Sequence, residues 1–512
     1  VDGVTAVGAG EGDWNQWRGA GRNGIVLDAT PLADSWPEEG PPLLWESEPI
    51  PSDHYGGHGS AVVSDDKVFM ALVWHRDVPT ETRAIDHRVL AKLGFRGTNF
   101  SDELKARLEG ARLDRNPRLR GSAFDAWAKS WVEENLDHDQ QMSLGSWCIS
   151  RLRAGSDALS FKDFDKLLEV RSRRFASHDE MAAWIDERSF SPEVAARIVE
   201  AVPNTRLAAQ EVILALDAQT GETIWKAAFE SEETARSGSS TPSVINGRVY
   251  AVLRQTLYCL DAASGKLLWK SPTPAIAPAS CPLVVDGKVV ILAGRLVAYG
   301  VETGEKLWEQ EAFSGQNASP VAWEVDDRGF IACNARDALV IVDARSGDVV
   351  ERIEGGGDAT PVVEGEFLVV FSSKKPGEGL HAFRLNDAGD GLEKLWTHNW
   401  DSRRKHSSPL IYEGHVYLVG GDRLMCVELV SGEIRWSEDR KLSISSPSIA
   451  DGKIYFLESN GNFLTMLEAS PEELVELGRA RVRGLACPSP TISKGKIFVR
   501  KADKLASFDL RD

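Results

Sequence analysis

The chain has few cysteines and lacks the short cysteine motifs that bind metals or haem. It has six cysteines in 512 residues, with no Cys-x-x-Cys pair, no two adjacent cysteines and none followed by a haem-attachment histidine. We interpret them as free thiols that act as small apolar side chains, rather than as disulfides. They are Cys148, Cys259, Cys281, Cys333, Cys426 and Cys487.

Long apolar runs, an excess of basic residues and common catalytic motifs are also missing. No apolar run approaches the length that spans a membrane, so we expect no membrane-spanning segment. With 77 acidic against 59 basic residues and a net charge of −18, the composition argues against a nucleic-acid partner. There is no His-Glu-x-x-His, no Gly-x-Ser-x-Gly and no phosphate-binding glycine loop. The histidines at 75, 87, 138 and 178 lack metal-ligand spacing.

What the chain does contain is a repeat of about forty residues. A phrase close to Leu-Asp-Ala-x-Thr-Gly-x-x-x-Trp occurs at 216–225 and 260–269, with weaker copies at 301–308, 342–347 and 429–436. A second phrase, a small residue followed by proline and an apolar run, keeps the same interval. Its prolines are Pro242, Pro282, Pro320, Pro361, Pro409, Pro447 and Pro490.

Each repeat predicts four short antiparallel strands. In the unit that begins at Ser239, Asn246-Gly247 predicts a tight hairpin, because both residues tolerate a positive φ. Four strands in each unit are typical of one blade of a β-propeller. The tryptophan four positions after each glycine is expected to pack between neighbouring blades.

The repeats predict eight blades. Seven start at the prolines, and one more starts at residues 58–63, with Ala61 in the proline position. The last unit stops after its third strand, Leu505 to Asp509. We expect Leu43-Leu44-Trp45-Glu46 to supply the missing outer strand and close the ring, so that no sheet edge is left unprotected there.

These repeats resemble the pyrroloquinoline-quinone-like propeller family, whose units carry an Ala-x-Asp-x-x-Thr-Gly-x-x-x-Trp phrase. The resemblance covers residues 36–74 and 211–512. The opening Asp13-Trp14-Asn15-Gln16-Trp17-Arg18-Gly19 also resembles secreted planctomycete-type members. The family includes quinone-dependent alcohol dehydrogenases, the outer-membrane assembly lipoprotein BamB and many exported proteins. It therefore implies a scaffold, and function must be argued from sites.

Residues 75–210 interrupt the repeat and predict a helical insertion in the first blade, after an N-terminal extension over residues 1–35. Ser122 to Asp125 and Ser177 to Glu180 have the spacing of capping boxes, and Pro192 follows Ser191 at a first helical position. The insertion leaves the loop between the second and third strands. In propellers that loop lies on the channel-mouth face, where we expect the helices to form a lid or wall.

The loops leading into the inner strands are the best candidates for a binding site, because they converge on the channel mouth. Three of them carry polar or charged side chains. Arginine forks suit carboxylates, phosphates or sulfates, and histidine with tyrosine suits sugars or acid–base work. The alternative is that these side chains form ion pairs or line a wet channel. The candidates are His54, Tyr55, His58, Asn317, Asp358, Arg403, Arg404 and His406.

Two classes of function follow. The first is a non-catalytic exported propeller that binds a protein or polysaccharide through the channel-mouth face and the helical insertion. The second is a quinone-dependent oxidoreductase with a degenerate cofactor site. Quinone enzymes of the resembled family use an adjacent cysteine pair and a calcium site, and neither is recognisable here. We therefore favour the first and expect no pyrroloquinoline quinone or calcium.

The chain begins with Val1, so we expect a signal peptide to have been removed.

Overall fold

The computed structural model describes residues 10, 12–26, 29–37, 39–50, 57–116, 118–231, 239–276, 279–373, 377–386, 389, 391–399 and 406–511. The chain divides into two compact units. One consists of Val1–His75 and Ala209–Asp512, hereafter the propeller unit, and the other of Arg76–Ala208, hereafter the helical unit.

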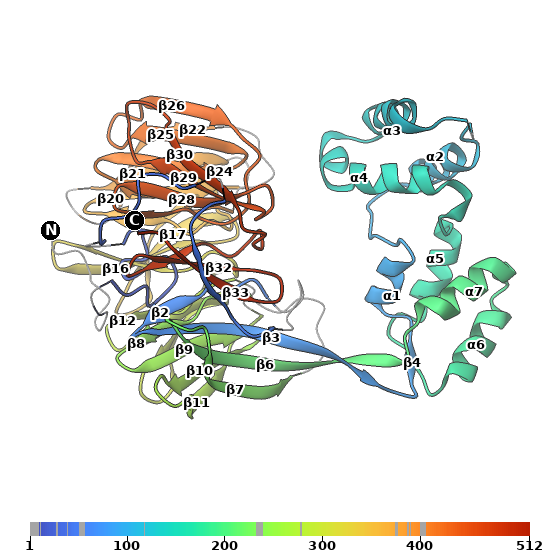
Figure 1. The fold of residues 1–512 in the computed structure, drawn as a ribbon, viewed down its shortest axis with the longest axis horizontal. Helices are drawn as coiled ribbons and strands as arrows, with labels where there is room; N and C mark the ends of the chain where they lie inside the picture. Colours follow the sequence, from blue (N-terminus) through green and yellow to red (C-terminus); the bar gives the residue numbers. More distant parts are fainter. Residues whose placement is uncertain are drawn as a thin grey trace. The chain divides into compact units, whose positions relative to one another are not determined.

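The propeller unit is built from antiparallel sheets that follow one another along the chain (Figure 1). The first sheet has the order β2-β3-β6-β7 (Val62–Ser64, Lys67–Pro79, Thr205–Asp217, Thr223–Ser231). The second is β8-β9-β10-β11 (Ser243–Ile245, Arg248–Leu253, Thr256–Asp261, Leu267–Pro272). The third has three strands, β12-β13-β14 (Leu283–Val285, Lys288–Gly300, Lys306–Gly315). Here β13 pairs with β12 at its start and with β14 further on.

The next sheets repeat the four-stranded pattern. The fourth is β15-β16-β17-β18 (Val321–Val325, Arg328–Asn334, Ala338–Asp343, Val349–Glu354). The fifth is β19-β20-β21-β22 (Val362–Glu364, Phe367–Ser372, Gly379–Leu385, Leu392–His398). The sixth is β23-β24-β25-β26 (Leu410–Tyr412, His415–Gly420, Arg423–Glu428, Ile434–Asp439). The seventh is β27-β28-β29-β30 (Ser448–Ala450, Lys453–Glu458, Phe463–Glu468, Glu476–Arg481).

The last sheet combines the two ends of the chain. Its order is β31-β32-β33-β1 (Thr491–Ser493, Lys496–Arg500, Leu505–Asp509, Leu43–Glu46). Trp45 pairs with Ser507, and Glu46 contacts Lys501 at 2.5 Å and Lys504 at 3.0 Å. The expected pairing of the N-terminal strand is therefore confirmed, and it covers the edge that β33 would otherwise expose.

Buried side chains join each sheet to the next around the ring. Val290 and Leu292 of the third sheet, for example, share a cluster with Ile331 and Val340 of the fourth. The last sheet packs on the first in the same way, through a cluster that contains Trp45, Phe498 and Val63. Sheets that pack successively and close on themselves have the architecture of a β-propeller.

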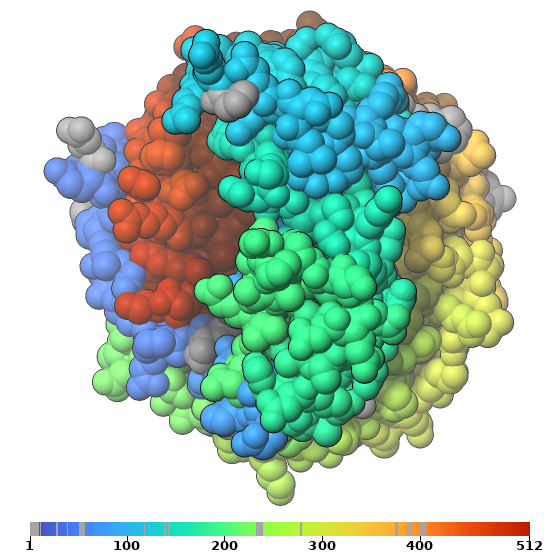
Figure 2. Space-filling view, turned by 90° about the vertical axis from the view of Figure 1, so that its right-hand side faces the viewer, coloured from blue at the N-terminus to red at the C-terminus, as the bar shows by residue number. Residues whose placement is uncertain are grey.

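All the helices of the described part lie between β3 and β6 of the first sheet. They are α1 (His87–Lys92), α2 (Asp102–Leu113), α3 (Gly121–Asn135), α4 (His138–Ala154), the 3₁₀ turn η1 (Gly155–Asp157), α5 (Phe161–Leu168), α6 (His178–Glu187) and α7 (Pro192–Ala201). A short sheet, β4 (Arg83–Ala84) with β5 (Arg174–Phe175), lies between them. Figure 2 shows the surface of these helices in colours from blue through cyan to green. Within the described residues no helix is long and apolar enough to cross a membrane.

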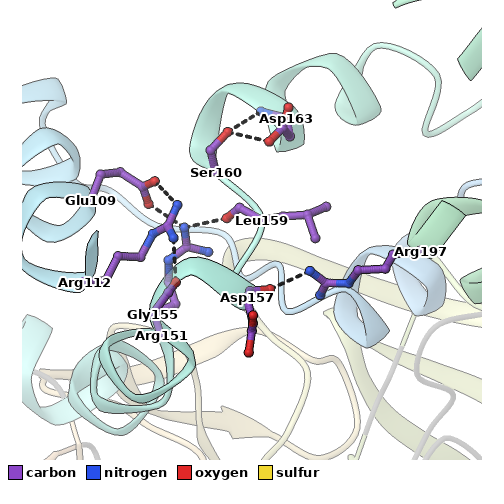
Figure 3. A network of polar contacts seen from close by, with 9 residues as sticks. All are labelled: Glu109, Arg112, Arg151, Gly155, Asp157, Leu159, Ser160, Asp163 and Arg197. Atoms are coloured by element: carbon purple, nitrogen blue, oxygen red, sulfur yellow. Dashed lines mark hydrogen bonds and ion pairs between the residues drawn. The ribbon is translucent and has the colours of Figure 1, made fainter. Parts of the chain in front are cut away.

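The helical unit has two apolar cores of its own. One contains Val89, Phe164, Trp184 and Ile198, and the other joins α2, α3 and α4. A polar network of Glu109, Arg112 and Arg151 links α2 and α4 to the residues that precede α5 (Figure 3).

The predicted helix starts are partly right. Ser177 and Ser191 cap α6 and α7 as expected, with side-chain oxygens that accept from Glu180 and Val194 backbone N–H groups. The prediction for Ser122 is wrong. Helix α3 already begins at Gly121, and Arg120 precedes it without a side-chain cap, so Ser122 lies inside the first turn. The five cysteines at 148, 259, 281, 333 and 426 are free thiols and are buried.

Candidate functional site

A closed ring of hydrogen bonds surrounds the centre of the propeller unit. It is formed by the residues immediately before the inner strands. In each step, the backbone N–H of one residue donates to the side-chain oxygen or sulfur of its counterpart in the next sheet, over 2.9 to 3.1 Å. The members of this inner ring are Ser60, Thr241, Cys281, Ser319, Thr360, Ser408, Ser446 and Ser489.

The sequence explains why these positions carry small polar residues. Seven of them precede the repeated prolines, and the residue before a proline favours an extended backbone. Each ring side chain must also fit beside its neighbours, since all eight are at least nine-tenths buried. A short hydroxyl or thiol side chain satisfies both requirements. The small residue of the second repeated phrase is therefore the acceptor for a backbone N–H of the preceding sheet.

A cavity of about 390 Å³ adjoins the inner ring, a volume within the range of small-ligand pockets. Five ring members line it. The lining consists of Trp17, His58, Ser239, Ala279, Cys281, Gln316, Asn317, Ser319, Asp358, Thr360, His406, Ser408, Ile444, Ser446 and Cys487.

Four of the eight candidate residues line this cavity: His58, Asn317, Asp358 and His406. The side-chain amide of Asn317 donates to one oxygen of Asp358 at 2.8 Å. Nε2 of His406 lies 3.3 Å from the other oxygen. The other four, His54, Tyr55, Arg403 and Arg404, lie outside the described residues.

The Asn317–Asp358–His406 group can orient an imidazole and present polar atoms to a ligand. Its carboxylate and imidazole side chains are about 35% and 44% exposed, so water screens their attraction and the pair contributes little to stability. The partly exposed side chains of this group can form hydrogen bonds to a molecule bound in the cavity.

The N-terminal segment, residues 12–26, contacts the inner parts of several sheets. Trp14 exchanges two backbone hydrogen bonds with Val63, each 2.9 Å long. The Asn15 side chain donates to Val244 at 3.1 Å, and the Trp17 indole donates to Thr360 at 3.3 Å.

Further along, the segment reaches the last sheets of the chain. Val26 donates to Ile449 at 2.8 Å, and Ile449 donates to Gly24 at 2.7 Å. Near its start, the Gly12 carbonyl accepts from Ser493 at 2.7 Å. The repeats predict no more than an N-terminal extension for this segment, and they do not indicate that Trp17 lines the cavity. The only feature of the sequence that marks this segment is the density of Trp, Asn and Arg over residues 13–24.

Two arginines of this segment are buried within the ring of sheets. Arg18 and Arg22 are 1% and 2% exposed. Arg22 donates to the carbonyls of Pro282 at 2.8 Å and Cys281 at 3.2 Å, and Arg18 donates to the carbonyl of Pro409. Burial lowers the pKa of Arg18 to about 9 and that of Arg22 to about 10, so both stay charged at neutral pH.

The described cavity wall is poor in acidic side chains. Asp358 is its one described carboxylate, and both of its oxygens already face protein groups. Calcium in proteins takes six to eight oxygen ligands. No cluster of three or more His, Cys, Asp or Glu side chains suited to a metal occurs among the described residues.

Comparison with known families matches residues 209–387 and 384–512 to the family described as outer membrane protein assembly factor BamB. Three curated relatives show partial similarity. Tetrathionate hydrolase of Acidithiobacillus ferrooxidans is 24% identical over 340 residues, covering 56% of this chain and 66% of that protein.

Quinohemoprotein alcohol dehydrogenase ADH-IIG of Pseudomonas putida is 33% identical over 130 residues, which are 21% of this chain and 18% of that enzyme. BamB of Burkholderia pseudomallei is 27% identical over 193 residues, 34% of this chain and 46% of that protein. The matches thus cover less than two thirds of the length of each of these relatives.

Proposed function

The chain belongs to the family described as outer membrane protein assembly factor BamB, and we propose from this membership that it is a non-catalytic, exported propeller that binds a protein partner. The observation that carries the proposal is the family match, which extends over the repeats from residue 209 to residue 512. Because that description refers to the outer membrane, we place the protein in the periplasm or outside the cell.

We propose an eight-bladed ring for the scaffold. Its parts are an N-terminal extension over residues 1–35, the propeller over 36–74 and 211–512, and a helical insertion over 75–210. Support comes from the closed cycle of hydrogen bonds through the inner ring, from Ser60 back to Ser489. The cycle takes one inner-ring residue from each sheet, so it closes only when all the sheets are present.

The partner surface is proposed to include the channel-mouth face and the helical unit. The helical unit lies outside the family match, so it is specific to this chain within that comparison. It also differs in charge from the propeller unit. It contains 22 basic and 22 acidic residues, which leaves the whole net charge of −18 on the propeller unit.

The second candidate is a quinone-dependent oxidoreductase, which is favoured by the 33% identity to a quinohemoprotein alcohol dehydrogenase over 130 residues. We rank it lower, because Asp358 contacts Asn317 and His406 and is the one carboxylate in the described lining of the cavity. We therefore propose that the protein works without a bound quinone or calcium.

Cross-linking in the native cell envelope tests this function. A tagged full-length protein is compared with a variant in which residues 76–208 are replaced by a short Gly/Ser turn. An Arg295→Gln variant is the control, since it alters only an exposed ion pair with Glu309 and Glu311. All three are checked for folding by circular dichroism.

We expect the full-length protein and the Arg295→Gln variant to cross-link to the same protein, and the excised variant to lose most of that product. Equal recovery with the excised variant would contradict a role for the helices. If only a polysaccharide is recovered, the partner is a polysaccharide and not the proposed protein. Dye-linked alcohol oxidation after addition of pyrroloquinoline quinone and calcium would favour the oxidoreductase.

A further inference from the structure

We propose that the cavity beside the inner ring is a binding site for a small oxyanion. The inference concerns a ligand of the propeller unit itself and does not depend on the protein partner. Two features carry it: hydroxyl groups of the inner ring that retain a hydrogen to donate, and two buried cations on the N-terminal segment.

Four hydroxyls of the inner ring are available as hydrogen-bond donors. Ser319, Thr360, Ser408 and Ser446 line the cavity, and each oxygen accepts a backbone N–H from the neighbouring sheet. A hydroxyl also carries one hydrogen of its own to donate. Among the described residues none of these four hydroxyls has an acceptor for that hydrogen. The cavity that they line is the space in which an acceptor can be placed.

Two positively charged side chains, Arg18 and Arg22, lie beside the wall of this cavity. Arg22 donates to the carbonyl of Cys281, which lines the cavity, and Arg18 to that of Pro409, which follows Ser408. Neither guanidinium has a carboxylate partner in the described part of the chain. Buried charges act over several ångströms because the protein interior screens them weakly.

The nitrogen atoms of these arginines are not fully used. Nε and Nη1 of Arg18 and Nε of Arg22 are buried and have no hydrogen-bond partner among the described residues. Burying two like charges without a counterion is unfavourable. A negative charge in the adjoining cavity would lower the electrostatic part of that cost.

The chemistry selects an oxyanion among possible occupants. A cation would be repelled by Arg18 and Arg22. A neutral sugar can accept from the ring hydroxyls, but it carries no negative charge to balance the two arginines. Sulfate, phosphate and carboxylate groups carry several acceptor oxygens and negative charge. Asp358 opposes an anion, but its two oxygens already face the Asn317 amide and the His406 ring.

The inner ring itself suggests a conservative variant. Cys281 occupies one of the eight positions and its sulfur accepts the Thr241 N–H at 3.1 Å. A Ser408→Cys/Ser446→Cys double variant therefore keeps the ring acceptors and replaces two strong O–H donors by weak S–H donors. Arg22→Gln removes one of the two cations. Asp358→Asn removes the opposing charge, and Arg295→Gln alters only an exposed ion pair with Glu309 and Glu311.

Isothermal titration calorimetry of the full chain with sodium sulfate, phosphate and acetate at constant ionic strength tests the site, with chloride as the reference anion. We expect saturable binding of one oxyanion. The double cysteine variant should bind about tenfold more weakly, because two hydrogen bonds to a charged group are weakened. Arg22→Gln should weaken binding as well, Asp358→Asn should strengthen it, and Arg295→Gln should leave it unchanged.

Sulfate and phosphate are tetrahedral and represent inorganic oxyanions, whereas acetate has a planar carboxylate and represents organic acids. Comparing them distinguishes these two possible sources of the ligand. A preference for one of these two kinds of anion supports the site and identifies the class of its ligand. If Arg22→Gln does not fold, the cysteine variant and Asp358→Asn still decide the question. Absence of saturable binding would overturn the proposal. So would equal affinity for chloride, or an affinity that the cysteine variant does not change.

Discussion

The indole of Trp225 on β7 lies against Gly265 of the next sheet. A β-carbon built on Gly265 would stand 2.5 Å from Cε3 of that indole, and the indole N–H donates to the Ala262 carbonyl at 3.1 Å. The same contact recurs between other neighbouring sheets. It joins Trp45 to Gly221, Trp269 to Gly304, Trp308 to Gly347 and Trp396 to Gly432. The repeated glycine thus leaves room for the tryptophan of the preceding sheet.

Replacing Gly265 by alanine should therefore destabilise the protein more than a turn glycine elsewhere. Gly265 and Gly247 share a φ of 72°, but a β-carbon at Gly247 would meet no described atom within 4 Å. Both variants incur the cost of a left-handed alanine, about 1–2 kcal/mol. Only Gly265→Ala also displaces an indole, which adds roughly 1–3 kcal/mol. Urea unfolding of the two variants measures the difference, and equal losses would refute the packing role.

The repeat made this packing predictable from the sequence, because tryptophan and glycine keep a fixed spacing in successive units. The expectation that these tryptophans pack between sheets is confirmed. Where the phrase fails, the packing changes: Glu351 stands in the tryptophan position, and its carboxylate would lie 3.1 Å from a β-carbon at Gly391. The four cavity residues also followed from the repeat, since they lie just before inner strands.

The N-terminal segment could not be placed in the same way. Its contacts join residues far apart in the chain, such as Trp17 and Thr360, 343 positions away. No period relates the segment to the repeats, so nothing in the spacing indicates which sheets it touches. Arg18 and Arg22 would be expected at the surface from their residue type, yet both are buried. Their burial depends on carbonyl groups that only the assembled sheets bring together.

Acid should weaken the fifth sheet through His381. Burial lowers the pKa of this histidine to about 4. Its Nε2 donates to the Gly377 carbonyl at 2.8 Å, and its Nδ1 accepts from Thr397 at 2.9 Å. In the unfolded chain the same group titrates near its ordinary pKa of about 6.5. Between these values the unfolded state binds more protons, so stability falls as the pH decreases from about 6.5 to 4.

The loss from this one group approaches about 3 kcal/mol over that range. His381→Gln keeps a donor and an acceptor but does not titrate. Unfolding free energies of both proteins should therefore be compared at several pH values, since carboxylates contribute equally to the two. The variant should show a shallower decline below pH 6.5. Parallel curves would mean that His381 does not control this pH dependence.

Quinone binding should be weak. With calcium present, titration of the full chain with pyrroloquinoline quinone is expected to show no submicromolar binding, because Asp358 is engaged by Asn317 and His406. Tight binding would contradict this expectation, and Asp358→Asn and Asn317→Ala would then test these two residues as ligands.

Glu109 should be essential to the helical unit. Its carboxylate contacts Arg151 Nη2 at 2.5 Å and also Arg112, whose side chains are only 4% and 3% exposed (Figure 3). The arginines also donate to the carbonyls of Gly155 at 2.6 Å and Leu159 at 2.7 Å. Glu109→Gln removes the one carboxylate described in contact with either arginine and leaves two buried cations, which costs about 3–5 kcal/mol.

The matched control is Asp125→Asn, which makes the same acid-to-amide change in an exposed pair. Asp125 lies 2.7 Å from Arg153, and both side chains are more than half exposed, so its loss costs at most about 1 kcal/mol. Urea unfolding followed by helical circular dichroism reports on this unit, because it contains the α-helices of the described chain. If both variants unfold at the same urea concentration, the buried network does not hold the helices together.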